Sequence, residues 1–272
     1  MTRILITGAA GHIGRKLAMF LTGRGYELRL FDIESGGNDA IEIADLSQWD
    51  EAWTNRLAGI DCVVHLAGCP RPDAGWNEIQ RLNLDMTMNV LEAASRKRVR
   101  RVVFASSNWV LAGWRWTDAP LNSATEPRPT NAYGMSKLAG ERLGHCYSRT
   151  RGLSFIALRI GYVPRVPSPQ PGPQMAWGPW GQQMWLSERD LCDGIERAIA
   201  APPNVDFAVV NLVSENEGMR WDLAEAERLI GYIPSDHGIP VITPEIAVGD
   251  QRAQHARLQI ERLEALLLAE RW

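Results

Sequence analysis

The chain has 272 residues, of which 45% are hydrophobic, and a formal net charge of -3. This length accommodates one large domain or a domain with an additional lobe. A nearly neutral chain has no long-range field that attracts nucleic acid or an anionic membrane, and no segment reaches the roughly 18 apolar residues that span a bilayer. We therefore expect a globular protein that binds neither nucleic acid nor membranes.

The N-terminal residues and the cysteines indicate the compartment. The sequence enters a turn after only a few apolar residues, so it lacks the hydrophobic run of a signal peptide. The cysteines show no spacing typical of metal ligands, and we expect reduced, structural thiols. These observations favour a cytoplasmic protein without a metal site. The cysteines are Cys62, Cys69, Cys146 and Cys192.

Short apolar runs alternate with helix-length segments through the first 160 residues. The runs are continuous rather than alternating, which is typical of strands buried on both faces of a sheet. Helical patterns such as residues 12–25 and 81–98 separate them. This order predicts an α/β fold, a Rossmann-type doubly wound parallel sheet. The predicted strands are residues 3–8, 27–32, 61–68, 100–107 and 155–161.

The alternation of apolar runs with helix-length segments weakens after Arg159. Residues 1–160 are expected to form the main domain and residues 161–245 a small substrate-binding lobe, with one helix between Ser187 and Pro202. Residues 246–272 predict a charged helical extension that packs on its own domain or on another subunit. Its leucines at approximately helical spacing are Leu258, Leu263, Leu266 and Leu267.

Three glycines, Gly8, Gly11 and Gly14, follow the first predicted strand and open the first helix. They allow a tight turn and a close backbone approach, and the helix N-terminus attracts a pyrophosphate, so residues 1–160 are predicted to bind a dinucleotide. Asp32 ends the second strand, where a carboxylate binds the adenosine ribose and repels a 2′-phosphate, which favours NAD over NADP. The other predicted cofactor contacts are His12, Ile13, Asp45, Leu46, Leu66, Ala67, Gly68, Tyr133 and Lys137.

Tyr133 and Lys137 are spaced to share one face of a helix. A phenol with a pKa of about 10 is a poor base at pH 7, and lowering that pKa by about three units requires about 4 kcal/mol. A nearby ammonium and an oxidised nicotinamide can supply this. Tyr133 is then expected to remove a hydroxyl proton while hydride leaves for NAD. Ser106, Ser107 and Asn108 end a predicted strand, and a serine there would hydrogen-bond the developing carbonyl.

Five motifs together resemble an extended short-chain dehydrogenase/reductase of the NAD-dependent epimerase/dehydratase family. The resemblance covers residues 1 to about 235 and implies an NAD-dependent enzyme that forms a dimer or higher homo-oligomer. It also implies that Tyr133, Lys137 and Ser107 are catalytic and that Asn83 supports a proton relay. The motifs are the Gly8–Gly14 turn, "HLAG" at 65–68, Asn83, "ASSN" at 105–108 and the Tyr133–Lys137 pair.

The segments "FASSN", "YGMSKLAGE" and "MWLSERD" are similar to the uronate dehydrogenase branch of this family. This narrower resemblance implies oxidation of a sugar at its anomeric carbon to a lactone, with Ser107 rather than Ser106 as the active serine. A lobe of about 85 residues without an evident arginine cluster offers little to hold a nucleotide-sugar diphosphate. The alternatives are a sugar epimerase or dehydratase that recycles NAD, and a non-catalytic NAD-binding protein.

The sequence departs from that branch at three positions expected near the substrate. Trp180 stands where an arginine is expected for a substrate carboxylate, Pro70 replaces a serine, and Trp109 replaces a histidine. Without a guanidinium, a carboxylate loses about 1.5 to 3 kcal/mol of charge-assisted hydrogen bonding. A uronate would then need another cation, for which Arg165 is the candidate, while Asn108 stays a predicted substrate contact.

Residues 167–185 contain prolines and tryptophans but no charged side chain. Proline and glycine indicate irregular backbone, whereas tryptophan indicates burial. Because the family resemblance resumes beyond the segment, we expect a loop that folds over the substrate rather than a linker. Trp177 and Trp180, with Trp109 across from them, would form an apolar or sugar-stacking wall. Core packing of the tryptophans is the alternative.

Overall fold

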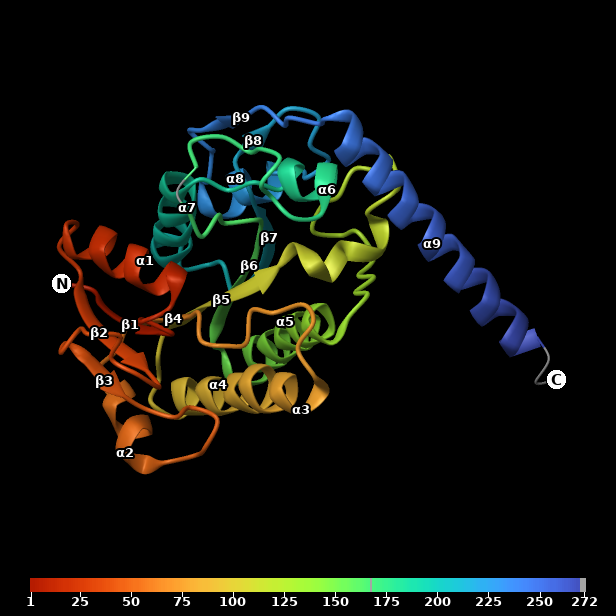
Figure 1. The fold of residues 1–272 in the computed structure, drawn as a ribbon. Helices are drawn as coiled ribbons and strands as arrows, with labels where there is room; N and C mark the ends of the chain where they lie inside the picture. Colours follow the sequence, from red (N-terminus) through yellow and green to blue (C-terminus); the bar gives the residue numbers. More distant parts are fainter. Residues whose placement is uncertain (167, 270–272) are drawn as a thin grey trace.

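A parallel sheet of seven strands forms the centre of the molecule (Figure 1). The computed structural model describes residues 1–166 and 168–269. The strand order is β3-β2-β1-β4-β5-β6-β7 with all neighbours parallel, so the chain winds in opposite directions from β1. The predicted Rossmann-type doubly wound sheet is confirmed. The strands are β1 (Arg3–Thr7), β2 (Glu27–Asp32), β3 (Ile41–Ile43), β4 (Cys62–His65), β5 (Arg101–Ser107), β6 (Ser154–Ile160) and β7 (Phe207–Leu212).

Helices cover both faces of the sheet. Successive side chains of a strand point to opposite faces, so each strand contributes side chains to both layers of the core. Ile4 and Ile6 belong to the core beneath α1 and α7, while Leu5 belongs to the core beneath α4. Both faces therefore require apolar strand residues, which explains the continuous apolar runs in the sequence. The covering helices are α1 (His12–Thr22), α7 (Glu188–Ala200) and α8 (Ala224–Ile230) on the first face, and α4 (Met86–Arg96) and α5 (Ala132–Arg151) on the second (Figure 1).

The predicted boundary at residue 160 does not separate two units. Both β7 and α7 lie in the range expected for the lobe, yet β7 pairs with β6 and α7 packs in the same core as α1. Asn211 interrupts the apolar run of β7 and is buried, where its amide nitrogen donates to the carbonyl oxygens of Leu121 and Asp222. Outside the sheet lies a small cap built from the loop after β6, α6 (Gly178–Gln183), β8 (Glu215–Asn216) and β9 (His237–Gly238).

Short helical turns connect the larger elements. The stretch η2 is π-helical and leads into α4, and η3 follows β5 directly. Among the described residues, no helix has the length and apolar character to cross a membrane, and no group of His, Cys, Asp and Glu side chains is arranged to hold a metal ion. The short elements are α2 (Glu51–Thr54), η1 (Asn55–Leu57), α3 (Trp76–Ile79), η2 (Gln80–Asp85) and η3 (Asn108–Trp114).

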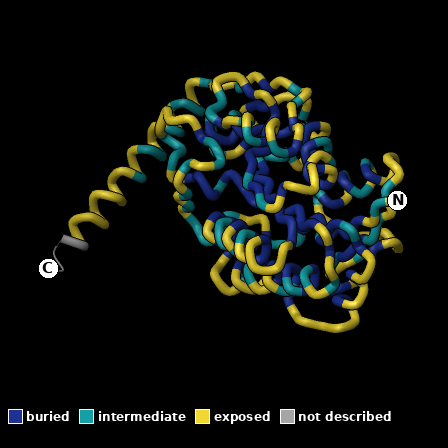
Figure 2. Tube along the Cα trace, turned by 180° about the vertical axis from the view of Figure 1, so that it is seen from behind, coloured by how far each residue is buried: buried dark blue, intermediate teal, exposed yellow. Residues whose placement is uncertain are grey.

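The C-terminal helix α9 (Pro244–Ala269) leaves the body of the molecule (Figure 1). Its first turns lie against α6, and Asp250 accepts a 2.7 Å hydrogen bond from Arg115. Beyond this anchor most of the residues from 251 to 267 are exposed (Figure 2). The first turns of the extension thus pack on their own domain, whereas its four leucines do not, and a contact with another subunit stays a prediction. The exposed leucines are Leu258, Leu263, Leu266 and Leu267.

Candidate active site

The glycine-rich turn leaves the N-terminus of α1 open. Gly8 has φ +72, and a Cβ there would lie 2.7 Å from the Ala67 nitrogen. A Cβ on Gly14 would overlap the Gly8 carbonyl oxygen, so the helix packs closely on the turn. Gly11 precedes α1 without any side-chain cap, and the first turn of α1 carries no acidic residue. The free N–H groups at His12 and Ile13 can therefore receive a phosphate, which fits the pyrophosphate of a dinucleotide.

Asp32 lies beside this turn at the end of β2. One carboxylate oxygen accepts a 2.8 Å hydrogen bond from the Ala10 nitrogen, and the other accepts one of 2.7 Å from the Ile33 nitrogen. These bonds fix the carboxylate next to the path expected for an adenosine ribose. Asp45, after β3, is occupied by the Ser47 nitrogen and hydroxyl at 3.0 and 2.6 Å.

Asp32→Ala is expected to reduce the preference for NAD over NADP by about tenfold or more, because it removes both a ribose acceptor and a charge that repels a 2′-phosphate. Titrations of both cofactors give the ratio of the two Kd values. Asp39→Ala removes an exposed carboxylate from the loop after β2, so it controls for the change in net charge. An unchanged ratio in Asp32→Ala would show that this carboxylate does not face the ribose.

Helix α5 carries Tyr133 and Lys137 in its first turns. Asn131 caps the helix by accepting a 2.8 Å hydrogen bond from the Gly134 nitrogen. The Lys137 Nζ atom lies 5.7 Å from the centroid of the Tyr133 ring and 5.1 Å from that of Phe104. Burial lowers the pKa of Lys137 to about 8. Burial also raises the pKa of Tyr133, although hydrogen bonding with Ser107 opposes this shift.

The two adjacent serines at the end of β5 have different environments. The Ser106 hydroxyl donates a 2.6 Å hydrogen bond to the buried Glu141 carboxylate. The Ser107 oxygen instead accepts a 3.2 Å hydrogen bond from the Trp109 nitrogen, and hydrogen bonding with Ser107 counteracts the rise in the pKa of Tyr133. This arrangement favours Ser107 over Ser106 as the serine beside the reacting atoms.

The Asn83 side chain connects the loop after β4 to α5 through hydrogen bonds. Its Oδ1 atom accepts a 2.7 Å hydrogen bond from the Cys69 nitrogen, and its Nδ2 atom donates to the Ser136 hydroxyl at 2.9 Å. Gly68, with φ +152, allows the close approach, since a Cβ there would lie 3.1 Å from Asn83 Oδ1 and 3.6 Å from Lys137 Nζ. The Asn83 side chain is thus engaged in positioning this loop, its carbonyl oxygen accepts a 2.6 Å hydrogen bond from the Thr87 hydroxyl, and its part in a proton relay stays a prediction.

The predicted cofactor residues at the neighbouring strand ends differ in exposure. Leu66 and Ala67 follow β4 and are partly buried, and their backbone borders the glycine turn. Leu46 is 2% exposed, and its carbonyl oxygen accepts a hydrogen bond from Asn89. A cofactor contact by the Leu46 side chain is therefore unfavourable, whereas contacts of Leu66 and Ala67 with the cofactor stay predictions.

Aromatic side chains gather next to Asn108. The rings of Trp109 and Trp177 are edge to face with centroids 5.0 Å apart, and Tyr162 lies 5.6 Å from Trp177. The Asn108 side chain is fully buried, and both of its amide atoms lack hydrogen-bond partners among the described residues. A buried amide without partners is costly, and hydroxyl groups of a ligand could satisfy it. Trp177 and Trp109 thus meet as predicted.

Trp180 is not placed as predicted, whereas Arg165 lies in the exposed loop after β6. Trp180 is 3% exposed and packs against Trp221, with ring centroids 5.0 Å apart, so it belongs to the core of the cap rather than to a substrate wall. Arg165 is exposed, and its charge contributes, after burial and Lys16, to a lowered pKa of His12. The adjacent Pro164 carbonyl oxygen lies 3.0 Å from the His12 Nε2 atom, so this part of the loop borders the cofactor turn, and a contact of Arg165 with a carboxylate stays a prediction.

One buried ion pair was missed by the sequence analysis. The Arg159 guanidinium on β6 donates two 2.9 Å hydrogen bonds to the Glu141 carboxylate on α5. Both side chains are almost fully buried, and Ser106 joins them from β5. The network therefore fixes the helix of Tyr133 on the sheet. Arg159 interrupts the apolar run of residues 155–161, and a charge buried in a strand requires a partner.

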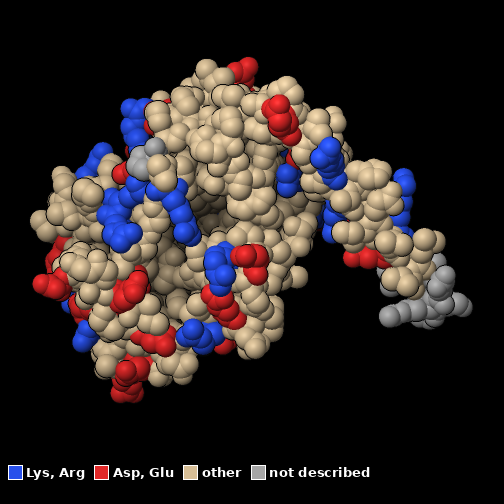
Figure 3. Space-filling model, in the orientation of Figure 1, with Lys and Arg blue, Asp and Glu red and all other residues tan. Residues whose placement is uncertain are grey.

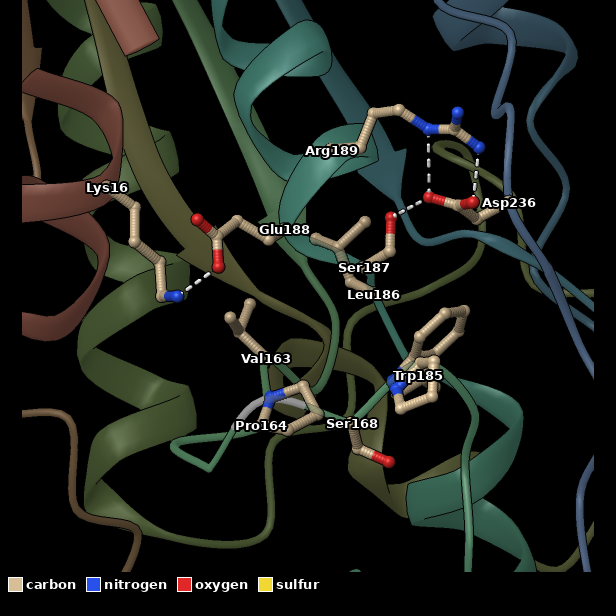
Figure 4. Close-up of a pocket in the computed structure, with 11 residues that line it drawn as sticks. Lys16, Val163, Pro164, Ser168, Trp185, Leu186, Ser187, Glu188, Arg189 and Asp236 are labelled. Atoms are coloured by element: carbon tan, nitrogen blue, oxygen red, sulfur yellow. Dashed lines mark hydrogen bonds and ion pairs between the residues drawn. The ribbon is translucent and has the colours of Figure 1, made fainter. Parts of the chain in front are cut away.

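A cavity of about 420 Å³ lies between α1, α7 and the loop after β6 (Figure 4). Two ion pairs line it, Lys16 with Glu188 and Arg189 with Asp236, so its charges are neutralised in pairs. Among the described residues that line the cavity, none is a predicted catalytic residue. The space-filling view shows a hollow in this face of the molecule, with both basic and acidic side chains around it (Figure 3). Because the chemistry-bearing groups gather around Tyr133, we place the reaction there and not in this cavity.

A comparison with models of protein families shows to which family the chain belongs. The model described as "NAD dependent epimerase/dehydratase family" matches residues 4–165, which include the glycine turn and Tyr133. The chain belongs to the NAD-dependent epimerase/dehydratase family. This membership confirms the predictions of the family and of NAD as the cofactor.

Members of the family resemble the chain over most of its length. An L-arabinose 1-dehydrogenase (NAD(P)(+)) from Haloferax volcanii is 35% identical, with 89% of this chain and 100% of the relative covered. A uronate dehydrogenase from Pseudomonas syringae pv. tomato is 34% identical, with 86% and 82% covered. A solved structure of a mutant uronate dehydrogenase from Agrobacterium tumefaciens in complex with NAD is 30% identical, with a TM-score of 0.71 and with 87% and 86% covered. These similarities confirm the prediction of an NAD-dependent enzyme.

Proposed function

We propose that this member of the NAD-dependent epimerase/dehydratase family oxidises a neutral aldose at its anomeric carbon, with release of NADH and a lactone. The observation that carries the proposal is the group of Asn108, Trp109 and Trp177 beside Ser107 and Tyr133. The backbone oxygen of Trp109 lies 2.6 Å from the position of a Cβ on Gly134, which places this group against the helix turn that carries Tyr133. An aromatic wall with a buried amide suits the apolar face and hydroxyl groups of a sugar ring.

The reaction follows from the positions of the side chains. NAD supplies the hydride acceptor when it is bound at the glycine turn. The Tyr133 phenolate accepts the proton of the anomeric hydroxyl as the C1–H bond breaks, so C1 loses two electrons and becomes the carbonyl carbon of the lactone. The Lys137 ammonium favours the phenolate, and the Ser107 hydroxyl donates a hydrogen bond to the oxygen on C1.

The arginines of the cap and of the segments beside it support a neutral substrate. Arg115 donates to Asp250 and to the Trp177 carbonyl oxygen. Arg220 donates to carbonyl oxygens of Trp114 and Arg115, and Arg165 lies near His12. The guanidinium groups of Arg115 and Arg220 are thus already engaged by partners within the protein. A carboxylate at C6 of the sugar would be left without a charged partner, which is unfavourable in a partly buried site.

Matched pairs of sugars test the proposal. D-glucose and D-glucuronate share their ring stereochemistry and differ at C6, as do D-galactose and D-galacturonate. We expect kcat/KM for NADH formation to be about tenfold to a hundredfold higher with the neutral member of at least one pair, because the carboxylate lacks a charge-assisted partner. A higher kcat/KM with the uronate in both pairs would contradict a neutral substrate while leaving the dehydrogenase chemistry intact.

A further inference from the structure

The distal part of α9 carries apolar side chains that nothing in the described chain covers. Ile260, Leu263 and Leu267 are 48%, 60% and 64% exposed, respectively. They lie on the portion of the helix that projects beyond the body (Figures 1 and 2). Helices that are stable in water usually bury an apolar face against a partner. This segment therefore has the character of half of an interface.

The apolar residues follow a heptad pattern. Their separations alternate between three and four positions, which places them on one stripe of the helix, as the a and d residues of a coiled coil do. The two alanines at the start of the stripe allow a close approach of helix axes, and the larger residues follow. The stripe consists of Ala253, Ala256, Ile260, Leu263 and Leu267.

The charged residues beside the stripe favour antiparallel over parallel pairing with a second copy. In an antiparallel pair that sets Ile260 opposite Leu263 of a second copy, Arg257 faces Glu264 of that copy, and the twofold axis repeats this contact. In a parallel pair, Arg252 would instead face Arg257, which is repulsive. The stripe is therefore complementary to itself only in the antiparallel direction. The existing Arg257–Glu261 ion pair is solvent-exposed and can exchange with a contact across the interface.

The body of the molecule fixes the direction in which the stripe is presented. Asp250 is tied to Arg115 at 2.7 Å, and Ile246 lies beside Gly178 on α6. The midpoint between Ile260 and Leu263 lies about 17 Å along the helix from Asp250, at a rise of 1.5 Å per residue. An antiparallel pair centred there would set the two bodies at opposite ends of the paired helices.

We propose that residues 253–267 of α9 pair antiparallel with the same segment of a second copy, and that this pair is a subunit interface of the protein. It joins two copies of the full chain and does not depend on the substrate. The sugar site lies on the body, so the interface can be disrupted without a change in the catalytic groups.

Light scattering with size-exclusion chromatography of the full chain at roughly 50 μM tests the interface. We expect Leu263→Asp to halve the molar mass of the wild type, because it places charges in the seam. Leu258→Asp introduces the same charge on the opposite side of the helix and is expected to keep the wild-type mass. Equal NAD affinity in the two variants would show that both are folded. A monomeric wild type, or an unchanged mass in Leu263→Asp, would overturn the proposal.

Charge reversal tests the antiparallel direction. Arg257→Glu and Glu264→Arg are each expected to weaken association by about tenfold, because like charges then meet twice across the twofold axis. The double variant restores opposite charges and is expected to associate within about threefold of the wild type. Failure of the double variant to recover, measured by sedimentation over a concentration series, would contradict the antiparallel pairing.

Discussion

Tyr133→Phe is expected to lower kcat for sugar oxidation by about a thousandfold or more, while the Kd for NAD changes by less than about threefold. Phenylalanine retains the ring, whose centroid lies 5.7 Å from Lys137 Nζ, but it removes the hydroxyl that would accept the substrate proton. Steady-state formation of NADH gives kcat, and fluorescence titration gives the Kd for NAD. The two readouts separate lost proton transfer from a damaged cofactor site.

Ser107→Ala provides the comparison for Tyr133→Phe. It removes one hydrogen bond to the oxygen on C1 and is expected to lower kcat by about a hundredfold, a smaller effect than loss of the base. In the wild type, kcat/KM is expected to rise as the pH increases through the range in which Tyr133 ionises, since burial raises the pKa of this phenol before NAD binds. Retention of a tenth or more of the turnover in Tyr133→Phe would contradict its role as the base.

Lys137→Met is expected to lower kcat by about a hundredfold or more and to stabilise the protein without NAD at pH 7. The ammonium is 6% exposed and burial lowers its pKa to about 8 from 10.5. The folded state therefore disfavours the charged form, at a cost of up to about 3 kcal/mol below pH 8. Methionine fills a similar volume without a charge, so unfolding in urea at pH 7 is expected to require a higher midpoint concentration.

The stability difference between Lys137→Met and the wild type is expected to depend on pH. Between the folded pKa of about 8 and the unfolded value of 10.5, the unfolded chain binds more protons at this position, so the stability of the wild type rises with pH. The advantage of Lys137→Met is expected to disappear toward pH 10.5. Lys97→Met removes a partly buried ammonium that donates a 2.7 Å hydrogen bond to Asn55, and it is expected to lower stability by no more than about 1 kcal/mol at any pH in this range. A Lys137→Met protein that is less stable than the wild type at pH 7 would contradict the cost of burial.

The elements that position the cofactor could be predicted because each has a strong local pattern. The predicted strands correspond to β1, β2, β4, β5 and β6. They lie in a sheet that is covered on both faces, and such strands have continuous apolar runs. Gly8 has a positive φ, and Gly14 allows α1 to pack closely on the turn. The spacing of the glycines in the sequence indicates both requirements. The Tyr133–Lys137 pair was recognisable because it lies on a single helix.

The remaining features depend on contacts between distant segments. β7 was missed because Asn211 interrupts its apolar run, and the partners of Asn211 at Leu121 and Asp222 could not be read from local sequence. Trp180 and Trp177 lie in the same loop, yet only the packing of Trp221 determines that Trp180 is in the core. The Arg159–Glu141 pair likewise joins a strand and a helix that only the fold brings together.

The ratio of NADH formed to aldose consumed tests the proposed reaction most directly. The enzyme, with a neutral aldose and excess NAD, would be followed by absorbance of NADH, with the sugar products separated by chromatography. We expect one NADH for each aldose consumed and a lactone, or the aldonate formed from it by hydrolysis, as the product. An epimerised or dehydrated sugar without accumulation of NADH would contradict the proposed oxidation and would indicate an enzyme that recycles its cofactor.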